Sequence, residues 1–391
     1  MHVLVVPSWY PTTEAPLRGI YFAEQAQILH DHGFTVGVVY PEQQSLRHLS
    51  WDALRRKHFQ TAWTTNHDVP VLRRYGWNVW WRAPPGMRVR VRHAVRLAHQ
   101  YVGRHGVPDV IHAHSARWAG AAAARMSDAL DVPFVLTEHF SGFVRNEIFP
   151  WRWPLVETAY RHAHGRAAVS SVLKDALAEY GLAAPNEIAV HPNPVRAALF
   201  ARPPDGRPAP PPFRLVTVAG LNPRKNVGDL LEAFAQAFAG SEAASLTLVG
   251  DGPQRGALED HARRLGIASQ ITFRGRLERT AVRDALWNAH AFVLSSRYET
   301  FGVALVEAMA TGLPVVATRC GGPEDIVTDE TGRLVPTEDP EALAEALRTM
   351  REQWASYDPN DIRAYVLDRY GPEPFVRRTR SFYRHARAAA P

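Results

Sequence analysis

Two carboxylates, Glu299 and Glu307, lie eight positions apart around a glycine in the sequence ETFGVALVE. An apolar run of strand type, AFVLSS at 291–296, precedes them, and an alanine-rich helical pattern leads to a second strand, PVVAT at 314–318. This pattern predicts Glu299 on a turn and Glu307 in the second turn of a helix. Because every other side chain from 303 to 309 is apolar, we expect the Glu307 carboxylate to be half buried and to need hydrogen-bond donors. A sugar diol or the ribose of a nucleotide would supply a matched pair of them.

Each glutamate also has an ordinary structural explanation when it is considered alone. Glu299 could be an acidic residue at a helix N-terminus, and Glu307 could be a salt-bridged residue of the core. However, Glu299 lies at the carboxyl end of a predicted strand, where open α/β sheets place their ligands. Together with the glycine turn between the two residues, this position favours a binding site.

The elements that must position these residues alternate between strand and helix along the whole chain. The 391 residues suffice for two domains, and the proline-dense segment 201–212 is the best candidate for a linker. Before it we expect a strand at 2–6, a helix at 20–32 and strands at 34–40, 109–114 and 133–139; after it we expect strands at 213–219, 245–250 and 271–275 and a helix at 227–238 capped by Asn226. This alternation predicts two Rossmann-like α/β domains that face each other across a central cleft.

Cations lie in the loop that follows the predicted strand 213–219. Arg224 and Lys225 come just before a helix N-terminus, where two positive charges and free N–H groups would bind a diphosphate. A solvated basic turn is the alternative explanation. On the same edge of the sheet we expect a tight turn at Gly252, backbone contacts to a base from Arg274 and Gly275, and a helix N-terminus at Gly302 and Val303 that attracts the anionic part of a ligand.

Glu299 would be repelled by a diphosphate, so we infer that it faces neutral sugar hydroxyls or the positive charge that develops at an anomeric carbon. Cations for a leaving diphosphate, next to a carboxylate for the sugar, are what glycosyl transfer needs. The sequence has no P-loop, no Gly-x-Gly-x-x-Gly after its first strand and no Asp-x-Asp in a strand-end loop. We therefore expect no cofactor and no metal ion.

Histidines end two of the predicted strands in the first half of the chain. His139 would follow the strand 133–139, where a neutral imidazole could hydrogen-bond a sugar hydroxyl or be satisfied by the local backbone. His112 and His114 share one face of a strand, and we expect them to be packing residues. The long loop after the first strand ends in Arg18 and Gly19 at a helix start, which suits an anion or an acceptor.

The charge balance predicts an anionic partner. The net charge is +6 and the isoelectric point is near 9.6, but no nucleic-acid-binding module is present, and we expect no nucleic acid. A run of aromatic and basic residues suits an anionic membrane surface, with a solvated basic helix as the alternative. The run consists of Trp77, Trp80, Trp81, Arg82, Arg88, Arg90, Arg92 and Arg96.

The single cysteine, Cys320, excludes an internal disulfide and suits a reducing compartment; we expect it to be a small buried residue. The N-terminal sequence lacks a charged start, and Pro7 interrupts its apolar run, so we expect no signal peptide. No run approaches the roughly 18 apolar residues of a membrane span. These features predict a cytoplasmic protein that can lie peripherally on the inner face of the cell membrane.

Taken together, these motifs resemble the retaining glycosyltransferases of family 4, which have the GT-B fold, and in particular members that build cell-envelope or exopolysaccharide chains. ETFGVALVE is similar to the Glu-x7-Glu signature of the family, and GLPVVAT with the following Gly-Gly is similar to its continuation. The resemblance implies that Glu299 lies by the donor sugar and that Glu307 binds the ribose. It further implies donor contacts from Gly19, Lys225, Gly252 and the backbone of Phe301, Gly302 and Val303, and it places His139 beside the sugar.

The resemblance also implies a hexosyltransferase without a metal cofactor that acts on a saccharide or lipid-linked saccharide acceptor. Residues 1–200 would be the acceptor-side domain, 213–370 the nucleotide-sugar-binding domain, and 371–391 a helix that crosses back to the first domain. The chain departs from the family at Gly220, where an arginine is usual, and at Pro194, where a glycine is common. The alternatives are a nucleotide-sugar epimerase of the same architecture and a nucleotide-sugar-binding protein that has lost catalysis.

Overall fold

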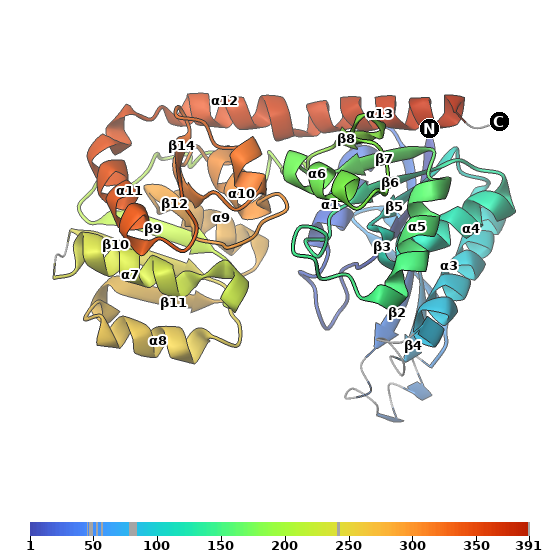
Figure 1. The fold of residues 1–391 in the computed structure, drawn as a ribbon, viewed down its shortest axis with the longest axis horizontal. Helices are drawn as coiled ribbons and strands as arrows, with labels where there is room; N and C mark the ends of the chain where they lie inside the picture. The colour runs from blue at the N-terminus through green and yellow to red at the C-terminus, as the bar shows by residue number, and fades with distance from the viewer. Residues whose placement is uncertain are drawn as a thin grey trace. The chain divides into compact units, whose positions relative to one another are not determined.

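The chain forms two compact units in the computed structural model, which describes residues 1–44, 46, 50–51, 54–55, 58–77, 84–240 and 243–389. The first unit comprises Met1–Asn193 together with Phe375–Pro391, and the second comprises Pro194–Pro374. Each unit is an α/β fold built around its own sheet (Figure 1). Across the described residues, no helix combines the length and the hydrophobicity that crossing a bilayer requires.

The described part of the first unit contains an eight-stranded sheet in the order β3-β4-β2-β1-β5-β6-β7-β8. Neighbouring strands are parallel except for the edge pair β3 and β4. The central strands are continuous apolar runs because helices cover both faces of a parallel sheet. The strands are β1 His2–Pro7, β2 Thr35–Gln44, β3 Thr61–Asn66, β4 Val69–Trp77, β5 Val110–His114, β6 Phe134–Glu138, β7 Gly165–Ala168 and β8 Ile188–Val190.

The helices of the first unit follow its strands, so that the loops after β1, β5 and β6 gather at the carboxyl edge of the sheet. They are α1 Ile20–Asp31, α3 Pro84–His105, the π-helical turn η2 Ala116–Gly120, α4 Ala121–Leu130, α5 Trp153–His162, α6 Ser171–Glu179 and, from the end of the chain, α13 Pro372–Ala388.

A buried polar network joins α13 to the sheet of the first unit. The hydroxyl of Tyr383 lies 2.7 Å from Nδ1 of His112, whose Nε2 lies 2.9 Å from the Thr137 hydroxyl. Four residues earlier in α13, the Thr379 hydroxyl lies 2.9 Å from Nε2 of His191. Burial lowers the pKa of His191 to about 3, so this imidazole is neutral and serves as a packing residue.

The second unit contains a six-stranded sheet, all parallel among its described residues, in the order β11-β10-β9-β12-β13-β14. Its strands are β9 Phe213–Val218, β10 Ala244–Val249, β11 Ile271–Gly275, β12 Ala291–Leu294, β13 Val315–Thr318 and β14 Gly332–Val335. Its helices are α7 Val227–Phe238, α8 Arg255–Arg264, α9 Arg279–Trp287, α10 Val303–Ala310, α11 Pro340–Gln353 and α12 Pro359–Tyr370.

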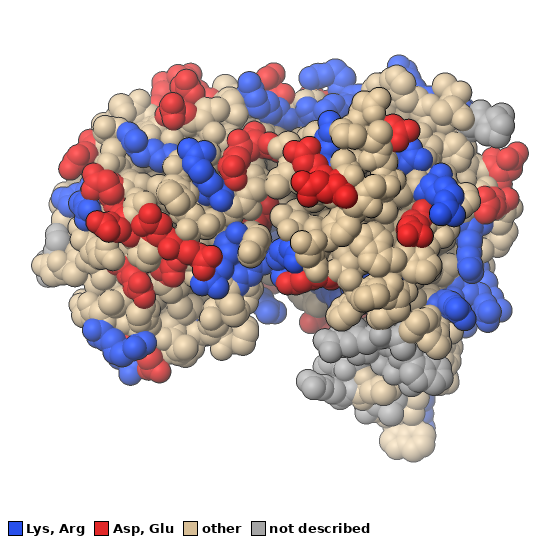
Figure 2. Space-filling view, in the orientation of Figure 1, with Lys and Arg blue, Asp and Glu red and all other residues tan. Residues whose placement is uncertain are grey.

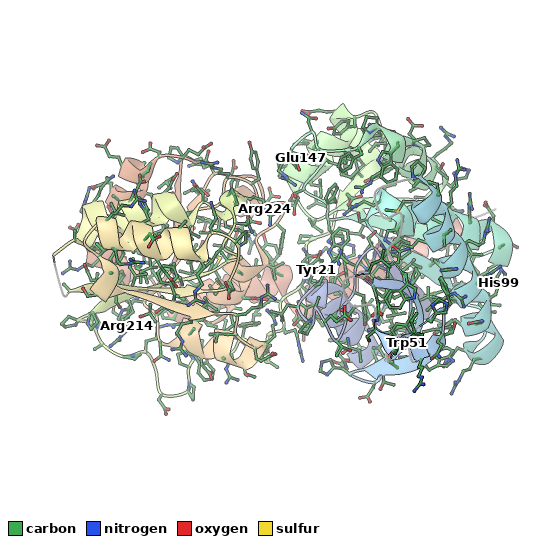
Figure 3. The ribbon with its side chains drawn as sticks, turned by 90° about the horizontal axis from the view of Figure 1, so that it is seen from below. Tyr21, Trp51, His99, Glu147, Arg214 and Arg224 are labelled. Atoms are coloured by element: carbon green, nitrogen blue, oxygen red, sulfur yellow. The ribbon has the colours of Figure 1, made fainter. Side chains whose placement is uncertain are left out.

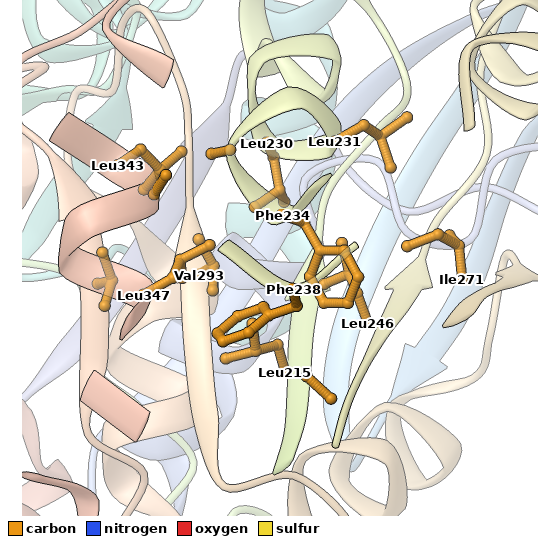
Figure 4. Packing of buried hydrophobic residues seen from close by; sticks show 14 of the residues in the cluster. Leu215, Leu230, Leu231, Phe234, Phe238, Leu246, Ile271, Val293, Leu343 and Leu347 are labelled. Atoms are coloured by element: carbon orange, nitrogen blue, oxygen red, sulfur yellow. The ribbon is translucent and has the colours of Figure 1, made fainter. Parts of the chain in front are cut away.

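The core of the second unit lies between this sheet and the helices α7 and α11 (Figure 4). Phe234 and Phe238 of α7 pack beside Leu215 and Leu246 of the sheet, and Leu347 extends the cluster from α11. The apolar side chains of α7 recur at helical spacing, which is why its predicted bounds and its observed bounds coincide. This burial fixes β9 and α7, and therefore the loop between them.

The proline-dense segment that the sequence suggested as a linker lies within the second unit, and the division between units falls after Asn193. Arg207, in the middle of the segment, donates hydrogen bonds to the carbonyls of Leu286 (2.7 Å), Ala289 (3.1 Å) and Thr311 (2.6 Å). These carbonyls lie at the ends of α9 and α10, where helices leave acceptors without intrahelical partners. Arg207 therefore fixes a segment that its proline content alone predicted to be a linker.

Candidate active site

The loop that follows β12 carries Glu299, and both sides of its backbone are fixed to the loop after β13. The N–H of Glu299 donates to the carbonyl of Cys320 (2.8 Å), and its own carbonyl accepts from the N–H of Gly322 (2.8 Å). A Cβ at Gly322 would lie 2.3 Å from the Phe301 carbonyl oxygen, so only glycine permits this approach. Cys320 is buried, and burial raises the pKa of its thiol to about 12, so it is a packing residue, as expected.

The carboxylate of Glu299 is buried and paired with Lys225. The side chain is 9% exposed; its Oε1 forms an ion pair with the Lys225 ammonium and accepts a hydrogen bond of 2.8 Å from the Ser296 hydroxyl. Burial by itself raises the pKa of Glu299, but the charges of Lys225 and Arg224 and the bonds from Lys225 and Ser296 lower it overall. The residue is therefore ionised at neutral pH.

The loop after β9 is held rigidly where it presents Arg224 and Lys225. The Asn222 side chain accepts from the Arg224 N–H (3.2 Å) and caps the short turn η5 Pro223–Lys225. The Ser295 hydroxyl donates to the Lys225 carbonyl (3.0 Å), and the Arg297 N–H donates to the Arg224 carbonyl (2.9 Å). Loops that are far apart in the sequence are thereby joined, which sets Lys225 beside Glu299.

Position 220, where the family usually has an arginine, is open in this unit. Gly220 is exposed, and a Cβ built there would be 3.3 Å from the Asn222 amide nitrogen and 3.9 Å from the Asp251 carbonyl oxygen. The space for a longer side chain exists, but the cation is missing. Arg224 supplies positive charge nearby, since its field lowers the pKa of Glu299.

Glu307 lies in the second turn of α10, as the sequence predicted, and its carboxylate has a cationic partner. The residue is 4% exposed, and its Oε1 is 2.7 Å from Nη2 of Arg279 at the start of α9. The Arg279 guanidinium also lies over the ring of Phe200, 4.8 Å from its centroid. The sequence indicated that Glu307 needs donors, but it gave no sign that a residue 28 positions earlier supplies one.

Gly302 is the N-cap residue of α10, with φ of 108°. This left-handed backbone turns the chain from Phe301, which is buried against Tyr370 with a centroid distance of 5.6 Å, into the helix at Val303. The first N–H groups of the helix begin here, within the same loop as Glu299. The turn therefore offers an anion-binding helix terminus beside a carboxylate.

The glycines after β10 and β11 allow the two strand ends to approach closely. The Gly250 N–H donates to the Gly275 carbonyl (2.8 Å), and a Cβ at Gly252 would lie 2.2 Å from the Leu221 carbonyl oxygen. The side chain of Arg274 lines a different region: a cavity of about 240 Å³ that it shares with Arg214 and residues of α9. Arg214 lies at the start of β9 and Arg224 in the loop after it, and Figure 3 shows the two residues apart from each other in the second unit.

The first unit carries the predicted residues His139 and Gly19. His139 directly follows β6, is 7% exposed, and its Nε2 lies 3.1 Å from Nδ1 of His114. Burial and the nearby His112 and His191 hold the pKa of His139 well below its usual value, so the imidazole is neutral. Gly19 has φ of 71°, and a Cβ there would be 2.6 Å from the Trp9 carbonyl oxygen.

Among the described residues, no group of three or more His, Cys, Asp and Glu side chains is arranged to hold a metal ion. The second unit places the Glu299 and Glu307 carboxylates beside cations, and the first unit places a neutral histidine directly after β6.

Comparison with known proteins assigns the family. Residues 19–199 match the family described as Glycosyltransferase Family 4, and residues 212–353 match the one described as Glycosyl transferases group 1. The two matches lie one in each half of the chain. The chain belongs to glycosyltransferase family 4. The resemblance seen in the Glu-x7-Glu sequence is thus confirmed.

Relatives of this family-4 glycosyltransferase include a glycogen synthase of Mycobacterium tuberculosis, 31% identical over 279 residues. That match covers 68% of this chain and 66% of the relative, or about two thirds of its length. A putative teichuronic acid biosynthesis glycosyltransferase of Bacillus subtilis, TuaC, is 26% identical over 363 residues that cover 89% of this chain and 88% of the relative.

Solved structures share the fold of this family-4 glycosyltransferase. The sucrose-phosphate synthase of Thermosynechococcus elongatus superimposes with a TM-score of 0.78 at 20% identity and covers 99% of both chains. Anabaena HepE in complex with UDP gives a TM-score of 0.73 at 19% identity, covering 97% of this chain and 99% of that one. The predicted GT-B fold class is therefore confirmed.

Proposed function

We propose that this glycosyltransferase moves a hexose from a nucleotide-sugar to a hydroxyl acceptor with retention of configuration at the anomeric carbon, in polysaccharide or glycolipid biosynthesis. The observation that carries the proposal is the ion pair between the buried Glu299 and the partly buried Lys225, in the loops that follow β12 and β9. It supplies a cation for a leaving diphosphate and a carboxylate for the sugar within one preformed constellation. Two of the solved structures with this fold contain UDP and UDP-glucose, which supports a nucleoside diphosphate donor.

In the proposed reaction, the bond between the anomeric carbon and the β-phosphate oxygen breaks while the acceptor oxygen attacks from the same face. The acceptor proton passes to the departing phosphate oxygen, so that no side chain need act as a base. Lys225, Arg224 and the N-terminus of α10 stabilise the charge on the leaving group. Glu299 stabilises the positive charge that develops on the sugar, and Glu307 accepts hydrogen bonds from the ribose.

The first unit contributes a hydrogen bond in this proposal. The neutral His139 donates to or accepts from a hydroxyl of the donor sugar without adding a charge. In this proposal the backbone at Gly19, Gly252 and Gly275 reaches the donor; at Gly19 and Gly252 a Cβ would collide with the carbonyl oxygens of Trp9 and Leu221, so these tight turns require glycine. We expect the reaction to proceed without a metal ion, so that excess EDTA leaves the rate unchanged.

A screen of melting temperature against UDP-, GDP- and ADP-sugars tests the proposal, because a ligand that binds only the folded protein raises its melting temperature. The stabilising donor is then incubated with saccharide acceptors, and the anomeric configuration of the product is read by NMR. An inverted product contradicts the proposed stereochemistry. Epimerisation of the donor without acceptor indicates an epimerase instead, and donor binding without turnover across a broad acceptor panel indicates a binding protein.

Arg279→Gln is expected to weaken donor binding about tenfold, which corresponds to about 1.4 kcal/mol. Without the guanidinium, the buried Glu307 carboxylate loses the ion pair that orients it toward the ribose. Calorimetric titration with the nucleoside diphosphate measures the change in Kd, and Arg279→Lys should restore part of it. Arg276→Gln, at an exposed position three residues earlier, is the control and should bind normally. Tighter binding by Arg279→Gln would show that the arginine competes with the ribose for Glu307.

We also propose that the exposed face of α3 contacts an anionic membrane. Arg88, Arg92 and Arg96 are exposed at four-residue spacing, and Figure 2 shows blue side chains gathered where α3 and α4 lie in Figure 1. Arg90 is different, because it turns inward and covers the ring of Trp118 at 4.3 Å. Of the aromatic residues predicted to join this surface, Trp77 lies in β4; Trp80 and Trp81, together with Arg82, lie outside the described residues.

Flotation with vesicles that contain anionic lipid tests this surface. The protein is expected to float at low salt, and the combined change of Arg88, Arg92 and Arg96 to glutamine should abolish flotation without altering the melting temperature, since all three side chains are exposed. Equal flotation of the parent and the variant would remove α3 from the contact. Vesicles of neutral lipid are the control.

A further inference from the structure

Four arginines of the first unit lie close enough for their charges to act on one another, three of them in segments that follow β1, β5 and β6, and the donor reaction proposed above uses none of them. Arg18 lies in the loop after β1, Arg90 on α3, Arg117 in η2 after β5, and Arg152 after β6. We refer to these four residues as the arginine cluster. Each belongs to a different segment, so the fold and not a local run of sequence brings them together.

Arg117 is the centre of the cluster. Its guanidinium lies over the ring of Phe140 at 4.7 Å and over that of Trp9 at 5.6 Å, so aromatic faces support it on two sides. Burial and the charges of Arg152, Arg90 and Arg18 lower its pKa to about 10. The neighbouring arginines are therefore close enough to repel one another, which costs free energy in the absence of an anion.

Arg90 is held in the same way. Its guanidinium lies 4.3 Å from the Trp118 ring centroid and donates to the Tyr40 hydroxyl at 3.4 Å. Burial lowers its pKa, and the charge of Arg18 lowers it further. Arg152 is 4% exposed and lies over the rings of Phe149 and Trp151.

Two acidic residues of this region are engaged with other groups. Glu138 is the carboxylate that raises the pKa of Arg117, but its oxygens accept backbone N–H bonds of 2.8 Å from Ala116, His139 and Phe140. Glu42 is paired with another arginine, Arg73, at 2.9 Å. Among the described residues, neither Arg90 nor Arg117 forms an ion pair.

The cluster also adjoins the residue expected to contact the sugar. Phe140, which carries the Arg117 guanidinium on its face, directly follows His139 in the chain. Glu138 bonds the N–H groups of both residues and that of Ala116, and so fixes η2 and the loop after β6 relative to each other. An anion bound by Arg117 would therefore lie close to His139.

We propose that the arginine cluster binds the anionic group of a saccharide acceptor, a phosphate or a carboxylate, and so selects acidic acceptors over neutral ones. The assignment of the bound anion to an acceptor rests on the proposed glycosyl transfer, whereas the existence of the anion site does not. The planar forks of several guanidiniums suit the oxygens of either anion, and aromatic stacking holds Arg90 and Arg117 in place without an ion pair to a described residue.

The test measures binding without a donor. Glucose 1-phosphate, glucuronate and glucose are titrated by calorimetry into the full chain carrying Lys225→Ala, which weakens the phosphate site of the second unit. One or both anionic sugars should bind, and the one that binds more tightly identifies the anion. Adding Arg117→Gln should weaken that binding at least tenfold, Arg117→Lys should retain only part of it because lysine keeps the charge but lacks the planar fork, and glucose should show no dependence on either change.

Arg125→Gln, at an exposed position on α4, is the matched control for a lost positive charge and should bind normally. Melting curves confirm that each variant is folded, and Arg18→Gln provides a second variant at an exposed position. Equal binding of the anionic sugars by the parent, Arg117→Gln and Arg18→Gln overturns the proposal. If anion binding depends on Arg117 but no donor sugar is transferred, the anion site stands and the proposed function fails.

Discussion

Glu299→Gln is expected to lower kcat by about 100- to 1,000-fold, the usual effect of removing one preorganised electrostatic group. Glutamine has the shape of glutamate and can still accept from Ser296, but it lacks the negative charge that stabilises the developing positive charge on the sugar. Because the change also removes a carboxylate next to the diphosphate, donor binding should stay equal or become tighter. Steady-state kinetics and calorimetric titration of the donor separate the two effects.

Glu352→Gln is the matched control, since this glutamate is exposed on α11 and should leave kcat unchanged. Melting curves establish that the Glu299→Gln protein is folded. Full activity in the folded Glu299→Gln protein would remove the carboxylate from the mechanism. A loss confined to donor affinity would assign Glu299 to binding alone.

Lys225→Ala is expected to weaken donor binding about 30-fold, or about 2 kcal/mol, the typical value of a hydrogen bond to a charged group. It removes the cation closest to Glu299 and, in the proposed reaction, a cation of the leaving diphosphate. The Kd for the nucleoside diphosphate measures the loss. Lys225→Arg should preserve part of the affinity, and Lys174→Ala on α6 is the control. Unchanged affinity would leave Arg224 and the helix terminus as the phosphate site.

The same variant should change the pH dependence of the enzyme. In the parent, Lys225 and Arg224 lower the pKa of Glu299, so the carboxylate stays ionised, and its contribution to stability is lost only as the pH falls through that lowered pKa. Without Lys225, fewer positive charges oppose the effect of burial on the carboxylate, and the pKa of Glu299 therefore rises. The acidic limb of the kcat profile should therefore move to higher pH in Lys225→Ala and stay in place in Lys174→Ala.

The parts of the site that the sequence predicted are those with strong local patterns. The strand–turn–helix–strand order around Glu299 and Glu307, and the bounds of α7, follow from hydrophobic periodicity and glycine placement. Asn226 is the N-cap residue of α7, as predicted; its backbone is left-handed, and its side-chain amide donates to the Asp229 carboxylate and not to the helix backbone. Local rules thus placed the cap residue correctly and did not reveal its hydrogen-bond partner.

Two contacts between distant segments were not predicted. Arg279 approaches Glu307 only because α9 and α10 lie next to each other in the folded unit. Arg207 turns an apparent linker into part of the second unit through carbonyls about 80 or more residues away. The edge strand β3 and the short strand β7 lack the length or the apolar content that marks a strand in sequence.

The division of the chain has a consequence for its synthesis. The first unit needs Phe375–Pro391, because Tyr383 and Thr379 supply the hydrogen bonds of His112 and His191 in its interior. When residue 193 has been translated, the first unit is therefore still incomplete. The whole second unit must be translated before the missing helix emerges. Over that interval His112 and His191 lack the partners that α13 supplies, and the nascent first unit is exposed to chaperones and proteases in this incomplete state. A version of this unit produced alone would have to join Asn193 to the terminal helix.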